Sequence, residues 1–245
     1  MTVDLSTTLV VMPALNEEES IAHVIREVFA VSRKLTILVV NDGSEDATAQ
    51  VARSAGALVA SLPYNLGVGG AMRCGFRYAS AHGFDNVVQV DADGQHAPAD
   101  IPRLIANLAH ADLVLGARFA GVGDYQARGL RRLAMIVLAK VLSRTTRTTL
   151  TDTTSGFRAS GPRAVALFAQ HYPAEYLGDT VESLVIAARA NLVIRQVPVA
   201  MRERSGGTPS QSPLRATAYL ARVGIGIVFA LIRPKISNHA EESSR

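Results

Sequence analysis

The sequence predicts an α/β fold built on a mostly parallel sheet with helices on both faces. Stretches of strand length alternate with stretches of helical periodicity through the first half of the chain, and the connections between them are short. The strand candidates are continuous apolar runs, which are typical of strands buried on both faces of a sheet. Both observations favour a doubly covered parallel sheet.

Length and composition suit a globular protein with a sizeable core. The chain has 245 residues, 48% of them hydrophobic. A single cysteine, Cys74, excludes an internal disulfide, and the N-terminus lacks a signal-peptide pattern, so we expect a cytoplasmic protein. The net charge of +4 suits anionic lipid or phosphorylated substrates, and aromatic residues are too few to favour a nucleic-acid partner.

The first half of the chain carries most of the expected elements. Asn16 is predicted to cap the first helix, with Glu17 in its first turn, and Ser44 to cap the second. Pro98 lies at the start of a further helix, where its missing N–H matters least. The expected strands are 8–14, 36–42, 57–61, 86–93 and 112–119, and the later helices are 69–81 and 98–108.

The second half is less regular. We expect an apolar helix with basic ends over about 128–144, followed by a loop that includes "TRTTLTDTTSGFR". A helix over 179–190 and a strand over 192–201 come next. The segment 202–213 is rich in turn residues, and a last helix is expected over roughly 214–232.

Polar clusters follow three of the predicted strands. They are "PALNEEE" at 13–19, "NDGS" at 41–44 and "DADGQH" at 91–96. In open parallel sheets, ligands bind outside the carboxyl ends of the strands. We therefore expect all three clusters to face one crevice.

The third cluster indicates a divalent cation. Asp91 and Asp93 are one residue apart and would repel each other unless a cation or a shared proton relieved the repulsion. Gln95 can add a neutral oxygen, because Gly94 permits the tight turn that brings it back. A solvated acidic turn that caps the next helix is the alternative, and His96 is expected to support the loop.

The other two clusters suggest a nucleotide. Asp42 can accept hydrogen bonds from a base or a ribose hydroxyl, although Asp-Gly is also a common turn. The stretch "GVGGAMRCG" at 67–75 would allow a close backbone approach to a phosphate, with Arg73 one turn into the helix. It follows the third strand and is no P-loop, so it does not indicate a dinucleotide or ATP site.

Taken together, these motifs resemble family 2 glycosyltransferases of the GT-A fold, most of all the dolichyl- and polyprenyl-phosphate sugar synthases. The motifs that carry the resemblance are "VVMPALNEEESI", "VVNDGSEDAT", "NLGVGGAMRCGF", "VVQVDADGQHAP", "LVLGARF" and "DTTSGFRA". They cover roughly residues 8 to 160 in order. The resemblance implies a nucleotide-diphosphate sugar as donor, Mg²⁺ or Mn²⁺ as cofactor, a polyprenyl phosphate as acceptor and inversion at the sugar carbon.

The resemblance also implies roles for individual residues. Asp91, Asp93 and Gln95 match the metal ligands. Pro13, Ala14, Asn16, Glu17 and Asp42 match positions that hold the nucleoside, and we add Gly69, Arg73 and Ala92 to the expected donor site. Arg118, Ser155 and Arg158 match the region that meets the acceptor phosphate, and we add Arg131 from the basic cluster. The expected catalytic residues are Asp91, Asp93, Arg118 and Asp152, of which Asp152 would orient an arginine or act as a base.

The type of acceptor decides whether a base is needed. A phosphate monoester is already largely an anion at neutral pH and needs positioning, for which arginines are suited. Seven Lys or Arg residues against one acid lie between residues 118 and 147, among them Arg128, Arg132 and Arg147. A soluble or polysaccharide hydroxyl acceptor in cell-envelope synthesis would instead require a general base, with Asp152, Asp179 and Glu182 as candidates.

Two apolar helices flanked by basic residues, 130–144 and 219–235, suggest contact with a membrane. Their apolar runs are shorter than the roughly 20 residues that span a bilayer, so we expect them to lie in the interface or on a small membrane partner protein. Packing on the domain or in a dimer is the alternative. We expect a catalytic domain over 1–212, a membrane-associating helix and tail over 213–245, and a location on the inner face of the cell membrane. The donor stays open among GDP-mannose, UDP-glucose and UDP-N-acetylhexosamine.

Overall fold

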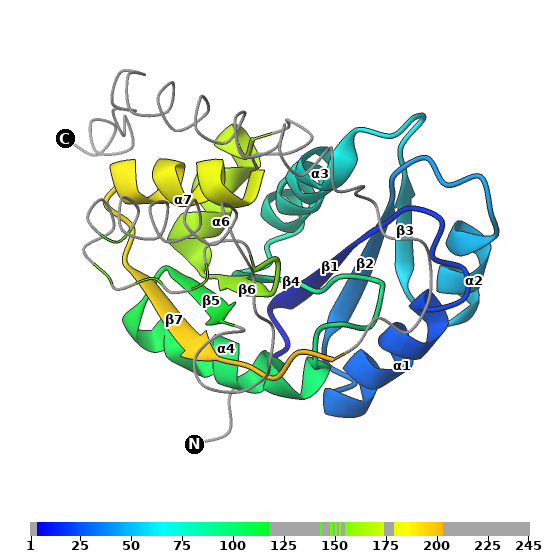
Figure 1. Cartoon of the computed structure of the whole chain (residues 1–245), viewed down its shortest axis with the longest axis horizontal. Coiled ribbons are helices and arrows are strands. Elements are labelled where there is room, and N and C mark those ends of the chain that lie inside the picture. The colour runs from blue at the N-terminus through cyan, green and yellow to red at the C-terminus, as the bar shows by residue number, and fades with distance from the viewer. Residues whose placement is uncertain are drawn as a thin grey trace, which may run out of the picture.

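A seven-stranded sheet organises the protein (Figure 1). The computed structural model describes residues 4–117, 143, 148, 150, 152, 155–173 and 179–202. The strand order is β3-β2-β1-β4-β6-β5-β7. The strands are β1 (Thr8–Ala14), β2 (Thr36–Asn41), β3 (Leu58–Ser61), β4 (Asn86–Gln89), β5 (Leu113–Ala117), β6 (Arg158–Ser160) and β7 (Ile194–Pro198).

All the strand pairs are parallel except those of β6, which lies antiparallel between β4 and β5. The helices are α1 (Ile21–Val31), α2 (Thr48–Ser54), α3 (Gly67–Ala81), η1 (Pro98–Asp100), α4 (Ile101–Asn107), η2 (Leu108–His110), α6 (Pro162–His171) and α7 (Asp179–Arg189). Helices α3, α6 and α7 cover one face of the sheet, and α1, α2 and α4 cover the other (Figure 1). The predicted mostly parallel sheet with helices on both faces is confirmed.

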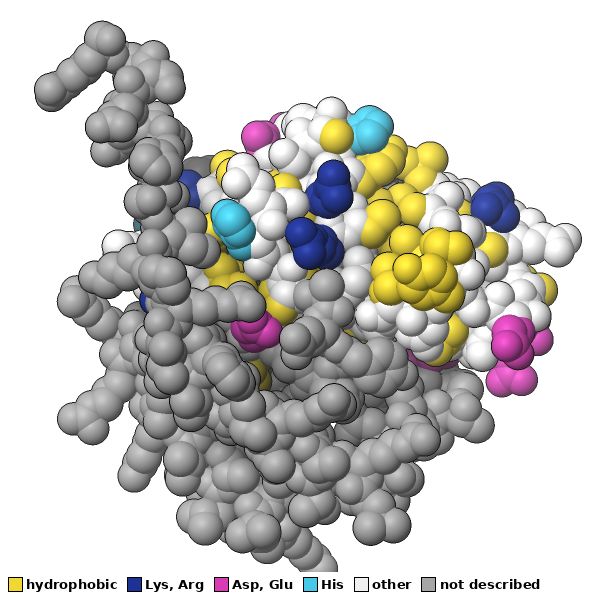
Figure 2. Space-filling view, turned by 90° about the horizontal axis from the view of Figure 1, so that it is seen from above, with side chains coloured by type: hydrophobic (Ala, Val, Ile, Leu, Met, Phe, Trp, Pro, Cys, Tyr) yellow, Lys and Arg dark blue, Asp and Glu magenta, His cyan; other side chains and the backbone are white. Residues whose placement is uncertain are grey.

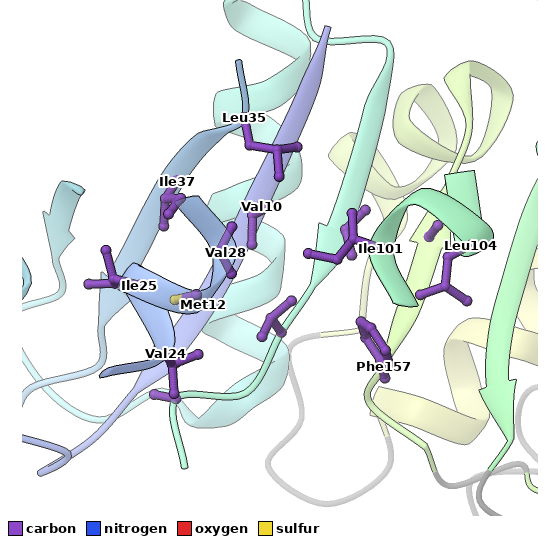
Figure 3. Close-up of a cluster of buried hydrophobic side chains, with 14 of the residues drawn as sticks. Val10, Met12, Val24, Ile25, Val28, Leu35, Ile37, Ile101, Leu104 and Phe157 are labelled. Atoms are coloured by element: carbon purple, nitrogen blue, oxygen red, sulfur yellow. The ribbon is translucent and has the colours of Figure 1, made fainter. Parts of the chain in front are cut away.

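Alternation along the strands divides the core into two layers. In β1, Leu9 and Val11 face α3, whereas Val10 and Met12 face α1. Figure 3 shows the second layer, in which Val24, Ile25 and Val28 of α1 pack over the sheet beside Ile101 and Leu104 of α4. The two layers cover both faces of the sheet, so a ligand would reach its polar residues at the ends of the strands.

Two elements of the second half were not predicted. The stretch that contains Arg158 was expected to be a loop, but residues 158–160 form β6 between β4 and β5. No helix was expected at 162–171, where α6 begins at Pro162. A three-residue strand with a charged first residue is too short for an apolar pattern, so only its two partner strands define it.

The predicted helices over about 128–144 and 214–232 lie outside the described residues, apart from Ser143. The boundary between residues 212 and 213 also lies outside them and stays a prediction. In the part of the chain that the structure describes, no helix has both the length and the apolar character needed to cross a bilayer.

Helix α3 lies very close to strand β1. Gly75 is buried, and a Cβ built on it would lie 2.5 and 2.8 Å from the two Cγ atoms of Val11 on β1. A valine in a strand cannot turn away easily, because its branched Cβ restricts χ1. Gly75 therefore sets the distance at which α3 packs on β1.

We expect Gly75→Ala to lower the free energy of unfolding. Alanine favours a helix by about 1 kcal/mol over glycine, but the extra methyl group would overpack the contact with Val11 at a cost of about 1–3 kcal/mol. Urea denaturation measures the net loss, with Ser80→Ala on the exposed side of the same helix as the control. A Gly75→Ala protein as stable as the wild type would contradict the close packing.

Candidate active site

The ends of three neighbouring strands bring the predicted polar clusters together. Strand β1 pairs in parallel with β2, from Leu9 opposite Thr36 to Ala14 opposite Asn41, and with β4, as far as Val11 opposite Gln89. Because all three strands run in the same direction, the loops that follow them leave the same edge of the sheet. The loops 15–20, 42–47 and 90–97 therefore form one polar edge, as the sequence predicts.

The loops after β1 and β2 are joined by hydrogen bonds in both directions. Backbone amides of the first loop donate to side chains of the second: Asn16 to Ser44 Oγ at 3.0 Å, Glu17 to Thr48 Oγ1 at 2.8 Å and Glu18 to Asp46 Oδ2 at 3.2 Å. In return, Glu45 N donates to Asn16 Oδ1 at 2.9 Å and Ala47 N to Glu18 Oε2 at 2.8 Å. These five bonds fix the two loops relative to each other.

This arrangement corrects both predicted helix caps. Helix α1 begins at Ile21 with Ser20 as its N-cap, and α2 begins at Thr48 with Ala47 as its N-cap. Asn16 instead adopts a left-handed backbone, with φ 54°, and binds the other loop. Asn16 and Ser44 form hydrogen bonds with partners 28 and 29 residues away instead of capping the helices that follow them. No local pattern reveals such distant partners.

Asp42 holds the start of α3. Its carboxylate is 4% exposed, and its two oxygens accept hydrogen bonds from Leu66 N at 2.7 Å and Gly67 N at 2.8 Å. Burial raises the pKa of Asp42 above its ordinary value, although both backbone bonds act in the opposite direction. The carboxylate thus caps a helix here, and its contact with a nucleoside stays a prediction.

Gly43 lets the loop after β2 lie directly against the loop after β3. Its φ is +77°, and a Cβ on it would lie 2.8 Å from Asn65 N and 2.9 Å from the carbonyl carbon of Tyr64. Only glycine combines this backbone conformation with such an approach. The loop after β3 is therefore pressed onto the loop after β2 beside Asp42.

The loop after β4 presents Asp91 at the surface. The Asp91 side chain is 38% exposed, while Asp93 is 9% exposed. Gln89 Nε2 donates to Asp91 Oδ1 at 3.1 Å, and Gln95 N donates to Asp93 Oδ1 at 3.0 Å. Gly94 has a φ of 79°, which is the tight turn that the sequence predicts.

His96 supports this loop from below. The ring is 2% exposed and stacks on Phe157, with centroids 4.9 Å apart. Its Nδ1 accepts a hydrogen bond from Asp91 N at 3.0 Å, so the neutral ring carries its proton on Nε2, which lies 3.5 Å from Asp91 Oδ2. The backbone and the carboxylate of Asp91 thus both contact one imidazole.

The chain beyond β7 crosses the same loop. Arg202 N donates to Gln95 O at 3.0 Å, and the backbones of His96 and Met201 form an isolated antiparallel β-bridge. The Arg202 guanidinium donates to both oxygens of Glu27 on α1, at 2.7 and 2.9 Å. The segment 199–202 is therefore tied to both α1 and the loop of Asp91.

The loop before β6 lies against Asp91. A Cβ on Gly156 would lie 2.9 Å from Gln89 Nε2 and 3.2 and 3.3 Å from the two carboxylate oxygens of Asp91. Neither Gln89 nor Gly156 was predicted to be a site residue, although Gly156 lies in the motif "DTTSGFRA". The register that places β6 beside β4 was the missing information.

Arg158 is buried behind this loop. It is 1% exposed and donates to Ser155 O at 2.7 Å, Ser183 Oγ at 2.9 Å and Thr180 O at 3.5 Å. Arg158 Nε and Ser155 Oγ are buried and have no hydrogen-bond partner within the described ranges. Their contact with an acceptor phosphate stays a prediction. Asp152 is fully buried, and its carbonyl accepts from Gln196 Nε2 at 2.7 Å.

The other predicted site residues fall into two groups. Pro13 and Ala14 end β1, Gly69 and Arg73 lie in the first two turns of α3, and Ala92 is buried between the two aspartates. The predicted acceptor arginines Arg118 and Arg131, together with Arg128, Arg132 and Arg147, lie outside the described residues.

The donor set suits a hard divalent cation. Asp91, Asp93 and Gln95 offer two carboxylates and an amide, and Mg²⁺ is usually held by one or two carboxylates with the remaining positions left to waters and substrate phosphates. Among the described residues, no group of three or more His, Cys, Asp or Glu could hold a metal ion. A cation bound here would therefore depend on a ligand for part of its coordination.

Apolar side chains border the polar edge near α3. Tyr64 is 65% exposed, Leu66 38% and Val68 45%. Figure 1 places the loop between β3 and α3 at the top of the molecule, and Figure 2, which looks down on that face, shows hydrophobic side chains gathered on it. A ligand beside Asp42 would thus meet apolar groups on one side.

Comparisons with known proteins identify relatives by sequence and a shared fold. The model of the family "Glycosyl transferase family 2" matches residues 9–166. The undecaprenyl-phosphate mannosyltransferase of Micrococcus luteus is 30% identical over 213 residues, which cover 83% of this chain and 87% of that protein. The UDP-N-acetylglucosamine–dolichyl-phosphate N-acetylglucosaminyltransferase of Methanococcus voltae is 27% identical over 209 residues, covering 77% and 83%.

A solved structure shares the fold. Glucosyl-3-phosphoglycerate synthase from Mycobacterium tuberculosis, crystallised with Mn²⁺, uridine diphosphate and glucosyl-3-phosphoglycerate, superposes with a TM-score of 0.72 at 23% identity. The match covers 93% of this chain and 80% of that one. At this level of identity the likeness is one of fold.

The hydrogen bonds between the first two loops make stability depend on pH through Asp46. Burial opposes ionisation of Asp46, but hydrogen bonds from the hydroxyl and amide of Thr48 and from Glu18 N outweigh it, so its pKa lies below 3.8. A carboxyl with a lowered pKa in the folded state stabilises the protein above its unfolded pKa, and this contribution is lost as the pH falls through the folded value.

We expect Asp46→Asn to lower the free energy of unfolding at pH 7 by roughly 0.5–1 kcal/mol, since Asp46 is partly exposed and solvent screens its charge. The difference from the wild type should shrink below pH 3.8. Denaturant unfolding at a series of pH values measures it, with exposed Glu45→Gln as the control. A difference independent of pH would contradict the role of the Asp46 charge.

Proposed function

The chain belongs to glycosyl transferase family 2, and from this premise we propose that it transfers a sugar from a nucleoside diphosphate to a polyprenyl monophosphate at a membrane surface. The observation that carries the proposal is the position of the Asp91–Gln95 loop. It lies at the edge of the sheet where the loops after β1 and β2 also emerge. A sugar diphosphate in that crevice would reach all three loops.

The acceptor class rests on the relatives. Both curated relatives described above are named for transfer to a polyprenyl-type phosphate, one to undecaprenyl phosphate and one to dolichyl phosphate. The sugars in their names differ, mannose in one and N-acetylglucosamine in the other. The proposal therefore names the acceptor class and leaves GDP-mannose, UDP-glucose and UDP-N-acetylhexosamine as candidate donors.

Asp91, Asp93 and Gln95 would hold Mg²⁺ or Mn²⁺ with the donor diphosphate. The cation supplies positive charge that stabilises the leaving nucleoside diphosphate. Asp91 is suited to this position because its carboxylate is exposed while Gln89 and His96 contact it from inside the protein. Asp93 is more buried, and its carboxylate stabilises the turn by accepting a hydrogen bond from Gln95 N.

The donor nucleoside would lie against the first two loops. The proposed contacts come from Pro13, Ala14, Asn16, Glu17 and Asp42, with Gly69, Arg73 and Ala92 nearer the diphosphate. The five hydrogen bonds between the loops favour this use, because they hold the two loops in place before a ligand arrives. Loops that are already ordered lose less entropy on binding.

The acceptor phosphate would need positioning rather than deprotonation. Its second pKa is about 6, so at neutral pH it is already largely a dianion. Arg118 and Arg131 are proposed to bind it with Ser155 and Arg158. Among the residues that the structure describes, Ser155 Oγ and Arg158 Nε have no hydrogen-bond partner, and this supports that part of the proposal, since buried polar atoms are normally satisfied. Attack by the phosphate oxygen on the sugar carbon would proceed in one displacement, with inversion.

The proposal is tested by following the sugar label. Purified protein is mixed with Mn²⁺, membranes and a panel of radiolabelled nucleotide sugars, and the lipid is extracted into organic solvent. We expect label from one donor to enter the lipid phase. Label that stays in the water phase with every donor would contradict a lipid acceptor.

In the same assay, Asp91→Asn and Asp93→Asn should each lower transfer at least about 100-fold, because each removes a charged ligand of the cation. Asp85→Asn is a matched control, since Asp85 is exposed at the other end of β4. Near-normal transfer by both site variants would exclude the assigned metal role.

Variants of the candidate bases separate the two acceptor classes. Loss of a general base typically costs about 10²–10⁴-fold in rate. With a phosphate acceptor, at least one of Asp152→Asn and Asp179→Asn should keep more than about a tenth of the wild-type rate, because no base is required. Thermal unfolding must accompany the assay, since Asp152 is fully buried. Complete loss in both variants, with the fold intact, would favour a hydroxyl acceptor.

A further inference from the structure

Gln89 is a buried amide at the end of an apolar strand. It is 4% exposed and follows Val87 and Val88 in β4. A buried amide without a hydrogen bond destabilises the folded state. Its Nε2 donates to Asp91 Oδ1 at 3.1 Å, and this side-chain bond joins the strand to the carboxylate.

The position of Gln89 gives this bond a fixed direction. Val87 lies in the core layer under α3 and Val88 in the other layer, so Gln89 points to the α3 side of the sheet. Arg158 lies directly opposite Gln89 on β6. The carboxylate requires a donor, so the amide nitrogen faces Asp91 and the amide oxygen is turned away from it.

Gly156 closes the other side of the same group. Its missing side chain leaves room for Gln89 Nε2 and for both oxygens of Asp91, which would all lie within 3.3 Å of a Cβ at this position. Such contacts would require the carboxylate or the amide to move. The pair is thus held between the loop before β6 and the sheet.

We propose that Gln89 is a positioning residue that sets the orientation of the Asp91 carboxylate toward the cation, and that Gly156 is required because it leaves space for the pair. The inference rests on the proposed function and deepens it. A single aspartate can rotate about two torsions, and an outer hydrogen bond restricts it to the orientation that binds. Loss of such outer partners typically weakens metal binding or activity about 10–100-fold.

The first test is Gln89→Met, which keeps the length and apolar stem of the side chain and removes the amide. Mn²⁺ is titrated alone, and again with UDP and with GDP, and the free ion is followed by electron paramagnetic resonance. We expect the Kd for Mn²⁺ to rise about tenfold or more. Gln170→Met, at an exposed position near the end of α6, is the control and should bind Mn²⁺ like the wild type.

The second test is Gly156→Ala, which acts on the pair without removing any polar group. We expect a similar rise in the Kd for Mn²⁺. Gly161→Ala is the matched control at the other end of β6, because a Cβ there would meet its nearest neighbours at an ordinary 3.6 Å. If Gln89→Met does not fold, Gly156→Ala decides the question, and thermal unfolding verifies the fold of each variant.

The kinetics distinguish positioning from a general structural role. In the positioning variants, the Mn²⁺ concentration for half-maximal transfer should rise, while the rate at saturating Mn²⁺ recovers most of the wild-type value. Unchanged Mn²⁺ affinity in folded Gln89→Met and Gly156→Ala, with Asp91→Asn still defective, would overturn this inference and leave the proposed function standing. A wild-type protein that binds no Mn²⁺ under any condition would overturn both.

Discussion

The parallel pairing of β1 with β2 on one side and β4 on the other is the constraint on which the rest of the site depends. Backbone hydrogen bonds fix the register of these strands, and their common direction sends three loops out at one edge. Asn16 in the loop after β1 binds the loop after β2, and Asp42 in that second loop binds the loop after β3. Loops joined in this way are held in place before any ligand is present.

The fold and the location of the site could be predicted from sequence, because both depend on local patterns. Apolar runs mark the buried strands, and the acidic pair after β4 marks the edge. Details that depend on distant partners could not. Asn16 and Ser44 resemble helix caps in sequence but bind each other's loops, and the short strand β6 is defined only by its neighbours. Gln89 was missed for the same reason. Its side chain contacts Asp91 beside Gly156, which is distant in the sequence, so no local pattern marks the contact.

Arg158 places a buried positive charge near the candidate site. Arg158 is almost fully buried and its partners within the described ranges are neutral oxygens of Ser155, Thr180 and Ser183. A buried guanidinium is costly unless anions lie near it. Arg158 lies directly opposite Gln89, so the two side chains point to the same face of the sheet. Under the proposed function, the anionic diphosphate and phosphate monoester would lower the cost of burying this charge.

In the proposed function, the carboxylates of Asp91 and Asp93 would share a cation with a sugar diphosphate at the end of β4. The most direct measurement is an anomalous difference map from crystals grown with Mn²⁺ and the nucleoside diphosphate that the protein binds. We predict a single strong peak within direct coordination distance of oxygens of both carboxylates and in contact with the diphosphate. A bound nucleoside diphosphate with the manganese peak elsewhere, or with no peak at all, would contradict it.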